Sequence, residues 1–154
     1  MSSDYQFLIA YIASLREGKR SNFVLPKGKS SEELTVLEAS FDVTVPNELK
    51  EFYNFSYAPK LDEYQFLSVD KVKEFQIQLL ATYRALHKES VLPFSRVVGT
   101  GDFIALDVNE IKAEGILILD GFHEIPPSEW TGICYGLRNW LERMVKSNFQ
   151  PFWL

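Results

Sequence analysis

The sequence is poor in the residues that build disulfides and metal sites. Its 154 residues include one cysteine, Cys134, and two histidines, His87 and His123. A single cysteine excludes an intramolecular disulfide and leaves no set of thiols for a zinc site, so nothing in the chain points to an oxidising compartment. We therefore expect no metal, no cofactor and a cytoplasmic location.

Long apolar runs are also missing. A membrane-spanning helix needs about 18 or more consecutive apolar residues, and no such stretch occurs. The first helix-like segment is interrupted by Asp4, Gln6 and Arg16, so it lacks the apolar core of an export signal. The sequence predicts a soluble protein without a signal peptide or a membrane span.

The charge balance is acidic. The chain has 21 acidic and 16 basic residues and a formal net charge of -5. An excess of acidic residues argues against direct nucleic-acid binding and favours a basic partner. The segment from Arg16 to Lys29 is the exception, because it contains five basic residues against Glu17 alone. A phosphate-contacting loop is one interpretation of it, but a solvated connection with glycine and proline is the preferred one.

The strands are predicted from short apolar runs. Phe103 to Val108 and Ile116 to Leu119 are each bounded by glycine and aspartate, which is typical of strands buried on both faces. We place these two strands at the centre of a largely antiparallel sheet formed from about Leu61 to Leu119, with one further strand from Leu61 to Val69. The length and the 46% of hydrophobic residues predict a single domain over residues 1–154.

Helical periodicity flanks these strands. Apolar residues three or four positions apart predict five helices: one that ends at Gly18, one capped by Ser30 and Glu33, one that follows Pro46 and is stopped by Pro59, a long one from Asp70 to His87, and a C-terminal one whose apolar face begins at Ile133. His87 would then lie at a helix C-terminus, where the helix dipole favours its charged form. The predicted fold class is α+β, with a central mostly antiparallel sheet flanked by helices.

No pattern of catalytic residues is complete. The segment from Gly132 to Gly136, G-I-C-Y-G, places Cys134 between glycines as a nucleophile elbow would, but both histidines precede it, against the hydrolase order. Asp102 and Asp107 bracket one strand, and their separation puts them on opposite faces. The sequence G-T-G-D, which ends at Asp102, lacks the lysine and the helix of a phosphate loop and predicts a turn with positive φ. We expect no enzymatic activity.

The segment that follows the second central strand is acidic and carries an aromatic residue. Asp120, His123 and Glu124 would suit a metal-ligand set, but the neighbouring prolines favour an exposed loop. With Phe122, this loop is a candidate contact surface. The last four residues, Pro151-Phe-Trp-Leu, are so apolar that we expect them to fold back onto the domain, or to form an interface if they are exposed.

One segment carries a family resemblance. Residues Glu38 to Tyr53 read E-A-S-F-D-V-T-V-P-N-E-L-K-E-F-Y, and they resemble the opening signature of the SUKH superfamily. Asp42 and Phe55-Ser56 depart from it, because the family usually has glycine at the first position and often has Asn-Gly at the second. The similarity continues through L-S-V-D-K-V, L-P-F, G-D-F-I-A-L-D, W-L-E-R-M and the terminal F-W-L, and so extends from about Ser31 to Leu154.

The resemblance implies the α+β architecture and a function. The superfamily consists mainly of bacterial immunity proteins, which bind and neutralise a cognate polymorphic toxin, often a nuclease, and it has a fungal branch of cell-wall-synthesis regulators. The resemblance therefore implies stoichiometric binding of a toxin protein without chemistry. The alternative is an intracellular regulatory or scaffold protein of the Smi/Knr type without a toxin partner.

A partner-binding surface for a basic toxin would combine acidic residues with aromatic anchors. Two acidic and aromatic segments of the sequence meet this description, and we predict that they form one surface. Its residues are Tyr57, Asp62, Glu63 and Tyr64 beside Asp120, Phe122, His123 and Glu124.

Overall fold

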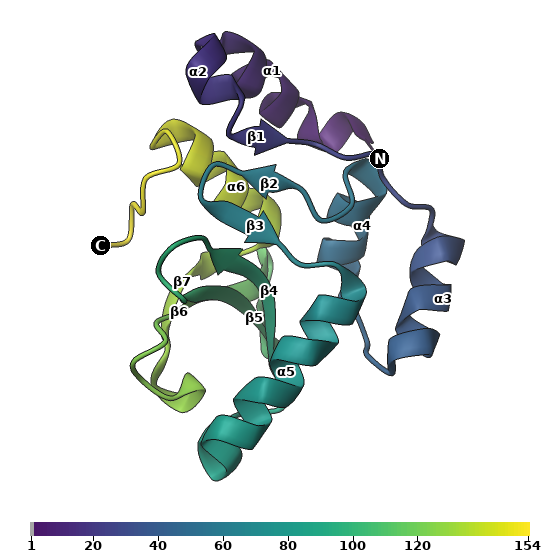
Figure 1. The fold of residues 1–154 in the computed structure, drawn as a ribbon, viewed down its shortest axis with the longest axis vertical. Coiled ribbons are helices and arrows are strands. Elements are labelled where there is room, and N and C mark those ends of the chain that lie inside the picture. Colours follow the sequence, from purple (N-terminus) through teal and green to yellow (C-terminus); the bar gives the residue numbers. More distant parts are fainter. Residues whose placement is uncertain (1) are drawn as a thin grey trace.

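The structure, a computed structural model, describes residues 2–154, with side chains from residue 4 onward, and consists of helices around one seven-stranded sheet (Figure 1). The strands lie in the sheet in chain order, from β1 to β7. Every neighbouring pair is antiparallel. The predicted α+β class with a central antiparallel sheet is confirmed.

The sheet is wider than the sequence predicts. Its strands are β1 (Phe23–Val24), β2 (Lys60–Leu61), β3 (Tyr64–Phe66), β4 (Val91–Val97), β5 (Phe103–Lys112), β6 (Gly115–Gly121) and β7 (Thr131–Tyr135). Strand β1 was missed because two residues are too few to show a periodicity. Ile133 lies in β7 and not in the last helix, because its spacing from the next apolar residues happens to fit both periods.

The predicted strand from Leu61 to Val69 is wrong, because a hairpin divides it. Leu61 pairs with Tyr64 across a two-residue turn. Asp62 makes this turn with a φ of 58°, in the left-handed region that aspartate tolerates better than most residues. The turn is held from both sides, since the backbone N–H of Asp62 donates to Asn22 and the carbonyl of Glu63 accepts from Val98.

The α-helices are α1 (Gln6–Ser14), α2 (Glu17–Arg20), α3 (Ser31–Phe41), α4 (Asn47–Phe55), α5 (Val69–Tyr83) and α6 (Leu137–Lys146). The capping box is confirmed, because Ser30 Oγ accepts from the N–H of Glu33 and Glu33 Oε1 accepts from the N–H of Ser30, both at 3.1 Å. The predicted end of the first helix at Gly18 is wrong, since α1 stops at Ser14 and Gly18 lies inside α2.

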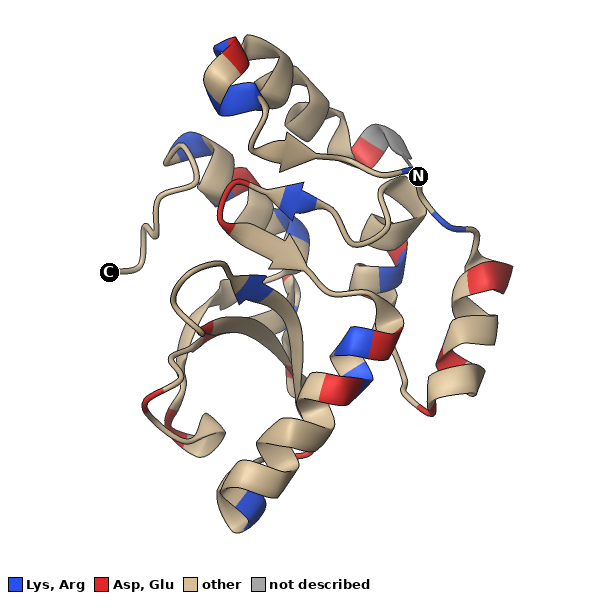
Figure 2. Ribbon diagram, in the orientation of Figure 1, with Lys and Arg blue, Asp and Glu red and all other residues tan. Residues whose placement is uncertain are grey.

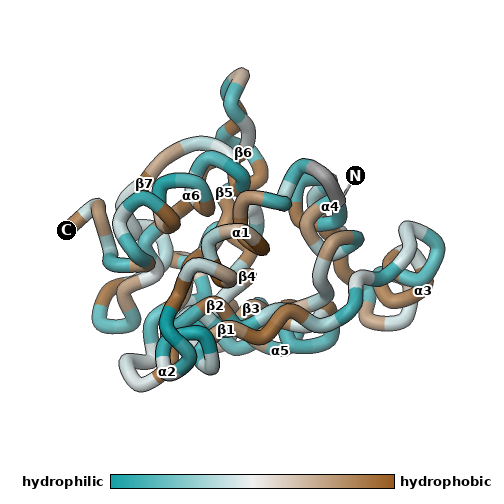
Figure 3. Tube along the Cα trace, turned by 90° about the horizontal axis from the view of Figure 1, so that it is seen from above, coloured by the Kyte–Doolittle hydropathy of each residue, from teal (hydrophilic) through white to brown (hydrophobic). Residues whose placement is uncertain are grey.

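Both faces of the central strands are buried, as predicted. Along β5 the side chains alternate: Ile104 and Leu106 belong to the main core with Trp140 of α6, whereas Ala105 belongs to a second cluster with Leu79 of α5. The hydropathy colouring of Figure 3 shows hydrophilic residues over α2 and a hydrophobic chain end at the C-terminus. Within residues 2–154, no helix combines the length and apolar character needed to cross a membrane.

Two glutamates hold the segment with the family signature in place. Glu38 Oε2 accepts from the N–H of Val45 at 2.6 Å, and its Oε1 lies 2.7 Å from Lys50 Nζ. Asp42 is the C-cap of α3 with a φ of 51°. A left-handed residue at this position suits the glycine that the resemblance implies here, and aspartate tolerates the same conformation.

Glu48 joins three elements. Its Oε2 accepts from the N–H of Ile116 at 2.7 Å and its Oε1 from the N–H of Leu137 at 2.9 Å, so it ties α4 to the starts of β6 and α6. Gly115 and Gly136 make this approach possible, since a Cβ on Gly115 would lie 2.6 Å from Glu48 Oε2 and 2.7 Å from Cα of Gly136. The negative carboxylate also complements the positive N-terminus of α6.

The prediction that His87 lies at a helix C-terminus, where its charged form is favoured, is wrong. The helix α5 ends at Tyr83, and a 3₁₀ turn (Arg84–Leu86) separates it from His87. His87 is 7% exposed, and neither of its ring nitrogens has a hydrogen-bond partner among the described residues. Burial lowers the pKa of the imidazole, although the charge of Glu89 partly opposes this effect. The neutral form is therefore favoured.

Candidate partner-binding site

A cavity with a volume of about 500 Å³ lies at one end of the sheet. Its walls come from the β2–β3 turn, the β4–β5 turn, the β6–β7 loop, the strand ends beside them and the C-terminal segment. The lining residues are Glu63, Tyr64, Val97, Thr100, Asp102, Ile104, Asp120, Phe122, Ile125, Thr131, Pro151, Trp153 and Leu154. We call this space the acidic cavity.

Its lining combines carboxylates with aromatic rings. Three acidic residues (Glu63, Asp102 and Asp120) and three aromatic residues (Tyr64, Phe122 and Trp153) contribute to it, and none of its described lining residues is lysine, arginine or histidine. Figure 2 shows acidic residues in the β2–β3 turn and in the β6–β7 loop, on the side of the molecule where the chain ends. A cationic group would therefore meet negative, neutral polar or apolar surface here, and no positive charge.

The sheet register places Asp120 in the wall of this cavity. In the antiparallel pairing Asp120 lies opposite Ile104 on one side and Thr131 on the other, and cross-strand partners share a face of the sheet. Asp120 Oδ2 accepts a hydrogen bond from Nε1 of Trp153 at 3.1 Å. Burial raises the pKa of this carboxyl, the bond from Trp153 lowers it in part, and the charge of Asp102 raises it further. The net effect is a raised pKa.

Trp153 brings the C-terminal segment back to the sheet. Its ring lies 6.4 Å from that of Trp140, and it is partly buried, as is Phe152. The prediction that the tail folds back is confirmed for these two residues. Leu154 is different, because it is 88% exposed although it lies at the edge of the acidic cavity.

Tyr64 forms the floor of the cavity. The residue is only 4% exposed, and its ring packs edge-on against Trp140 at 5.6 Å. Its hydroxyl has no hydrogen-bond partner among the described residues. Burial raises the pKa of this phenol, and the charges of Glu63 and Asp120 raise it further, so the hydroxyl stays protonated and available as a donor.

Asp102 fixes the loop that closes the cavity. Its Oδ1 accepts from the N–H of His123 at 3.0 Å and lies 2.6 Å from Nδ1 of the same residue. Burial raises the pKa of Asp102, but the hydrogen bonds from His123 and Thr100 outweigh this and hold the pKa below its usual value. Gly99 and Gly101 shape the preceding turn with φ values of 90° and 80°, so the predicted turn is confirmed.

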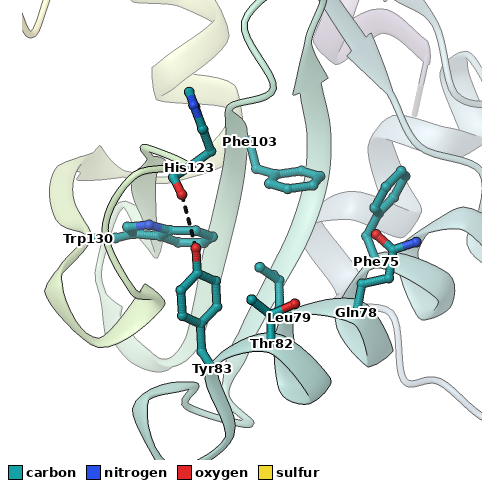
Figure 4. A pocket seen from close by; sticks show the side chains of 8 residues that line it. All are labelled: Phe75, Gln78, Leu79, Thr82, Tyr83, Phe103, His123 and Trp130. Atoms are coloured by element: carbon teal, nitrogen blue, oxygen red, sulfur yellow. Dashed lines mark hydrogen bonds between the residues drawn. The ribbon is translucent and has the colours of Figure 1, made fainter.

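A second, smaller cavity of about 170 Å³ lies on the other face of the sheet, between α5 and the β6–β7 loop. Figure 4 shows Phe103, Leu79 and Trp130 directed toward its centre, and the hydroxyl of Tyr83 donating to the carbonyl of His123 at 2.9 Å. His123 therefore borders this cavity, whereas its partner Asp102 borders the acidic one.

The structure brings together four of the eight residues predicted for partner binding, since Glu63, Tyr64, Asp120 and Phe122 all line the acidic cavity. The other four lie around it or apart from it. Asp62 stands in the adjacent turn, and His123 and the exposed Glu124 lie in the β6–β7 loop.

Tyr57 lies apart from this group. Its hydroxyl accepts from the N–H of Val69 at 2.9 Å, and its ring packs against Tyr53 at 5.2 Å. These contacts place it between α4 and α5, and it is not among the described lining residues of the acidic cavity.

Sequence reasoning missed several lining residues. Trp153 carried a usable signal, because an aromatic residue in an apolar tail needs a surface to cover. Asp102 was considered only as part of a carboxylate pair with Asp107, which is buried and accepts from the N–H of Asn109. Val97 and Thr131 gave no signal, since their place depends on the strand register alone.

The other chemical alternatives gain no support from the geometry. Cys134 lies inside β7 and not at a strand–helix turn, and burial raises the pKa of its thiol despite the opposing charge of Arg143. Residues 4–154 contain no group of three or more histidine, cysteine or acidic side chains arranged to hold a metal ion. Asp120 and His123, two members of the candidate metal set, have separate partners.

Comparison with known proteins gives one result at the level of the family. The profile described as SMI1 / KNR4 family (SUKH-1) matches residues 28–143. The match includes the glutamates of α3 and α4 and most of the acidic cavity, but not the C-terminal segment with Trp153. A search of curated proteins finds no match to the chain.

Proposed function

Because the chain belongs to the SMI1 / KNR4 family (SUKH-1), we propose that it is an immunity protein, which neutralises a cognate polymorphic toxin by stoichiometric binding in the cytoplasm and performs no chemistry itself. The observation that carries this proposal is the acidic cavity, whose described lining contains three carboxylates and three aromatic rings but no basic side chain. A basic toxin, such as a nuclease, complements such a surface.

The binding surface extends beyond the cavity. A specific interface buries about 800 Å² on each partner, which is more than one cavity supplies. The half-buried Asp62 and the exposed Glu63 and Glu124 enlarge the negative surface, and Phe122, which is 39% exposed, supplies an apolar anchor. The acidic rim would mainly raise the association rate and the specificity for a basic partner.

The test is to express the protein encoded by the reading frame immediately upstream, with and without this chain, and to score growth and co-purification. We expect the upstream protein to be toxic alone, and this chain to restore growth and to co-purify with it. Absence of toxicity and of a complex would contradict the proposal and favour the alternative, a regulatory or scaffold protein of the Smi/Knr type.

A charge reversal tests the location of the surface. We expect Asp62→Lys with Glu63→Lys to slow association with the toxin about tenfold at low salt, and less at high salt, because electrostatic steering is screened. The matched control is Glu110→Lys with Glu114→Lys, which reverses two exposed carboxylates at the opposite end of the sheet. Equal association rates for the two double variants would remove the β2–β3 turn from the interface.

A further inference from the structure

We propose that the acidic cavity is a receptor for one arginine side chain of the partner protein. The inference rests on the proposed function in that it takes the partner to be a protein. It goes further by naming the chemical group that is recognised and the atoms that recognise it.

The size of the cavity suits a side chain. Its volume of about 500 Å³ lies in the range of about 300–1,000 Å³ that is typical of ligand pockets. The floor is apolar and fully buried at Ile104, and Tyr64 and the partly buried Ile125 and Val97 complete it. The same lining contains Glu63 and Asp120, so the cavity offers apolar surface to a stem and carboxylates to its tip.

Several acceptors in the cavity are not used within the chain. Asp120 uses Oδ2 to accept from Trp153, and Oδ1 has no hydrogen-bond partner among the described residues. The exposed side chain of Glu63 likewise has no hydrogen-bond or salt-bridge partner within the described part of the chain. Asp102, by contrast, is engaged with His123. Two carboxylates are thus available to a group with several donors.

The shape of the lining favours a guanidinium over an ammonium. A guanidinium is planar, donates in a fork that fits carboxylates, and stacks on aromatic faces. Tyr64, Phe122 and Trp153 provide three rings beside the two available carboxylates. The protein already makes the same kind of contact elsewhere, since the guanidinium of Arg143 lies 5.8 Å from the ring centre of Phe152.

The electrostatics of Asp120 also favour a positively charged ligand. Asp120 is a partly buried carboxylate close to the charge of Asp102, and these two conditions raise its pKa. A bound cation would offset both effects, whereas a neutral ligand would offset neither. The free protein therefore carries a cost at this carboxylate that a positively charged side chain removes.

The test is a titration of the protein with N-acetyl-arginine methylamide, followed by nuclear magnetic resonance at the indole N–H of Trp153 and the backbone amides of Asp120 and Phe122. We expect saturable shifts with a dissociation constant of about 1–10 mM, the range available to a ligand of this size. The matched probe is N-acetyl-citrulline methylamide, which has almost the same shape without the charge, and it should bind at least fivefold more weakly. The lysine analogue should fall between the two.

Variants locate the binding site. Asp120→Asn keeps an acceptor for Trp153 but loses the charge, and Glu63→Gln alters an exposed position, where we expect little change in stability. Each should weaken binding of the arginine compound at least fivefold, whereas Glu124→Gln, in the same loop but outside the cavity, should leave it unchanged. Equal binding of the citrulline compound, undiminished binding by both cavity variants, or no saturable shift at the cavity residues would each overturn the proposal.

The arginine titration and the toxin experiment test different claims, so a negative result in one does not decide the other. A protein that binds the arginine compound but does not rescue growth would contradict the immunity function and keep the arginine receptor. A protein that rescues growth but does not bind the arginine compound would contradict the receptor and keep the immunity function.

Discussion

Carboxylates do different work in two regions of the molecule. At the junction of α4, β6 and α6, both oxygens of Glu48 accept from backbone N–H groups, and both oxygens of Glu38 nearby are also paired. In the acidic cavity, Asp120 uses one oxygen and Glu63 uses none within the described chain. Carboxylates of the first kind hold elements together, whereas those of the second kind remain available for a ligand.

The paired carboxylates lie in the segment with the family signature, whereas the available carboxylates lie in the candidate site. Glu38 and Glu48 lie in the segment with the signature of the family, and three of their four partners are backbone N–H groups, the fourth being Lys50 Nζ. The residues that line the cavity come from strand ends and from the turns, loop and tail beside them, and in turns, loops and tails sequence can change without loss of the fold. A family of this design can keep one scaffold and vary the partner.

The largest expected effect is at Glu48. Glu48→Ala leaves the buried N–H groups of Ile116 and Leu137 without their acceptor, and we expect it to lower the free energy of unfolding by about 3 kcal/mol. Urea unfolding measures this loss. The control is Glu51→Ala, on an exposed position of the same helix, which should change stability by less than about 0.5 kcal/mol. Similar losses for the two variants would show that the junction is not held by this carboxylate.

His87 is a buried polar group whose ring nitrogens have no hydrogen-bond partner among the described residues, in contrast to the paired oxygens of Glu48. We expect His87→Leu to raise the free energy of unfolding by about 1 kcal/mol at pH 8, since an unsatisfied polar group is replaced by an apolar one. The gain should grow as the pH falls below about 6.5, the pKa of histidine in an unfolded chain. Because burial lowers the folded pKa, the unfolded chain binds the proton first, and acid therefore destabilises the wild type.

Urea unfolding at several pH values between 8 and 5 checks this prediction, with the value at pH 8 serving as the measure of packing alone. A constant difference between His87→Leu and the wild type across this range would mean that His87 titrates alike in the folded and unfolded chains.

The smallest expected effect is at Asp120. We expect Asp120→Asn to raise the free energy of unfolding at pH 7 by no more than about 1 kcal/mol, because asparagine can still accept from Trp153 and the partly buried charge is removed. The folded pKa of Asp120 is raised, so its cost is present when it is ionised and disappears as the pH falls through that pKa. The variant and the wild type should therefore converge in stability toward acid pH.

Thermal unfolding of both proteins between pH 7 and pH 4 measures this convergence. A loss of several kcal/mol in Asp120→Asn would place Asp120 with Glu48 among the structural carboxylates, and the distinction between the two regions would fail.

Much of the fold could be predicted because its signals are local. The capping box of Ser30 and Glu33 needs only its own segment, and the alternation of Ile104, Ala105 and Leu106 follows from the period of a strand. The turn at Asp62 escaped prediction because aspartate takes a conformation usually assigned to glycine. Ile133 was assigned to the wrong element because a single apolar residue fits the period of a strand as well as that of a helix.

The candidate site was predicted in parts and not as a whole. Neighbouring pairs such as Glu63 with Tyr64 and Asp120 with Phe122 were found because acidic and aromatic residues adjoin in the sequence. The contact of Trp153 with Asp120 joins residues 33 positions apart and depends on the path of the tail after α6. No local pattern encodes such a contact, so only the folded chain reveals that the C-terminal segment forms one wall of the cavity.

The loop between β6 and β7 is held by bonds on both sides. Asp102 accepts from the N–H of His123, Tyr83 donates to the carbonyl of His123, and the indole of Trp130 donates to the carbonyls of Phe122 and Ile125. A loop arranged in this way before contact has little conformational entropy left to lose. Ordering a free side chain costs about 0.5–1.5 kcal/mol, so a partner that meets this surface retains more of the contact energy as affinity.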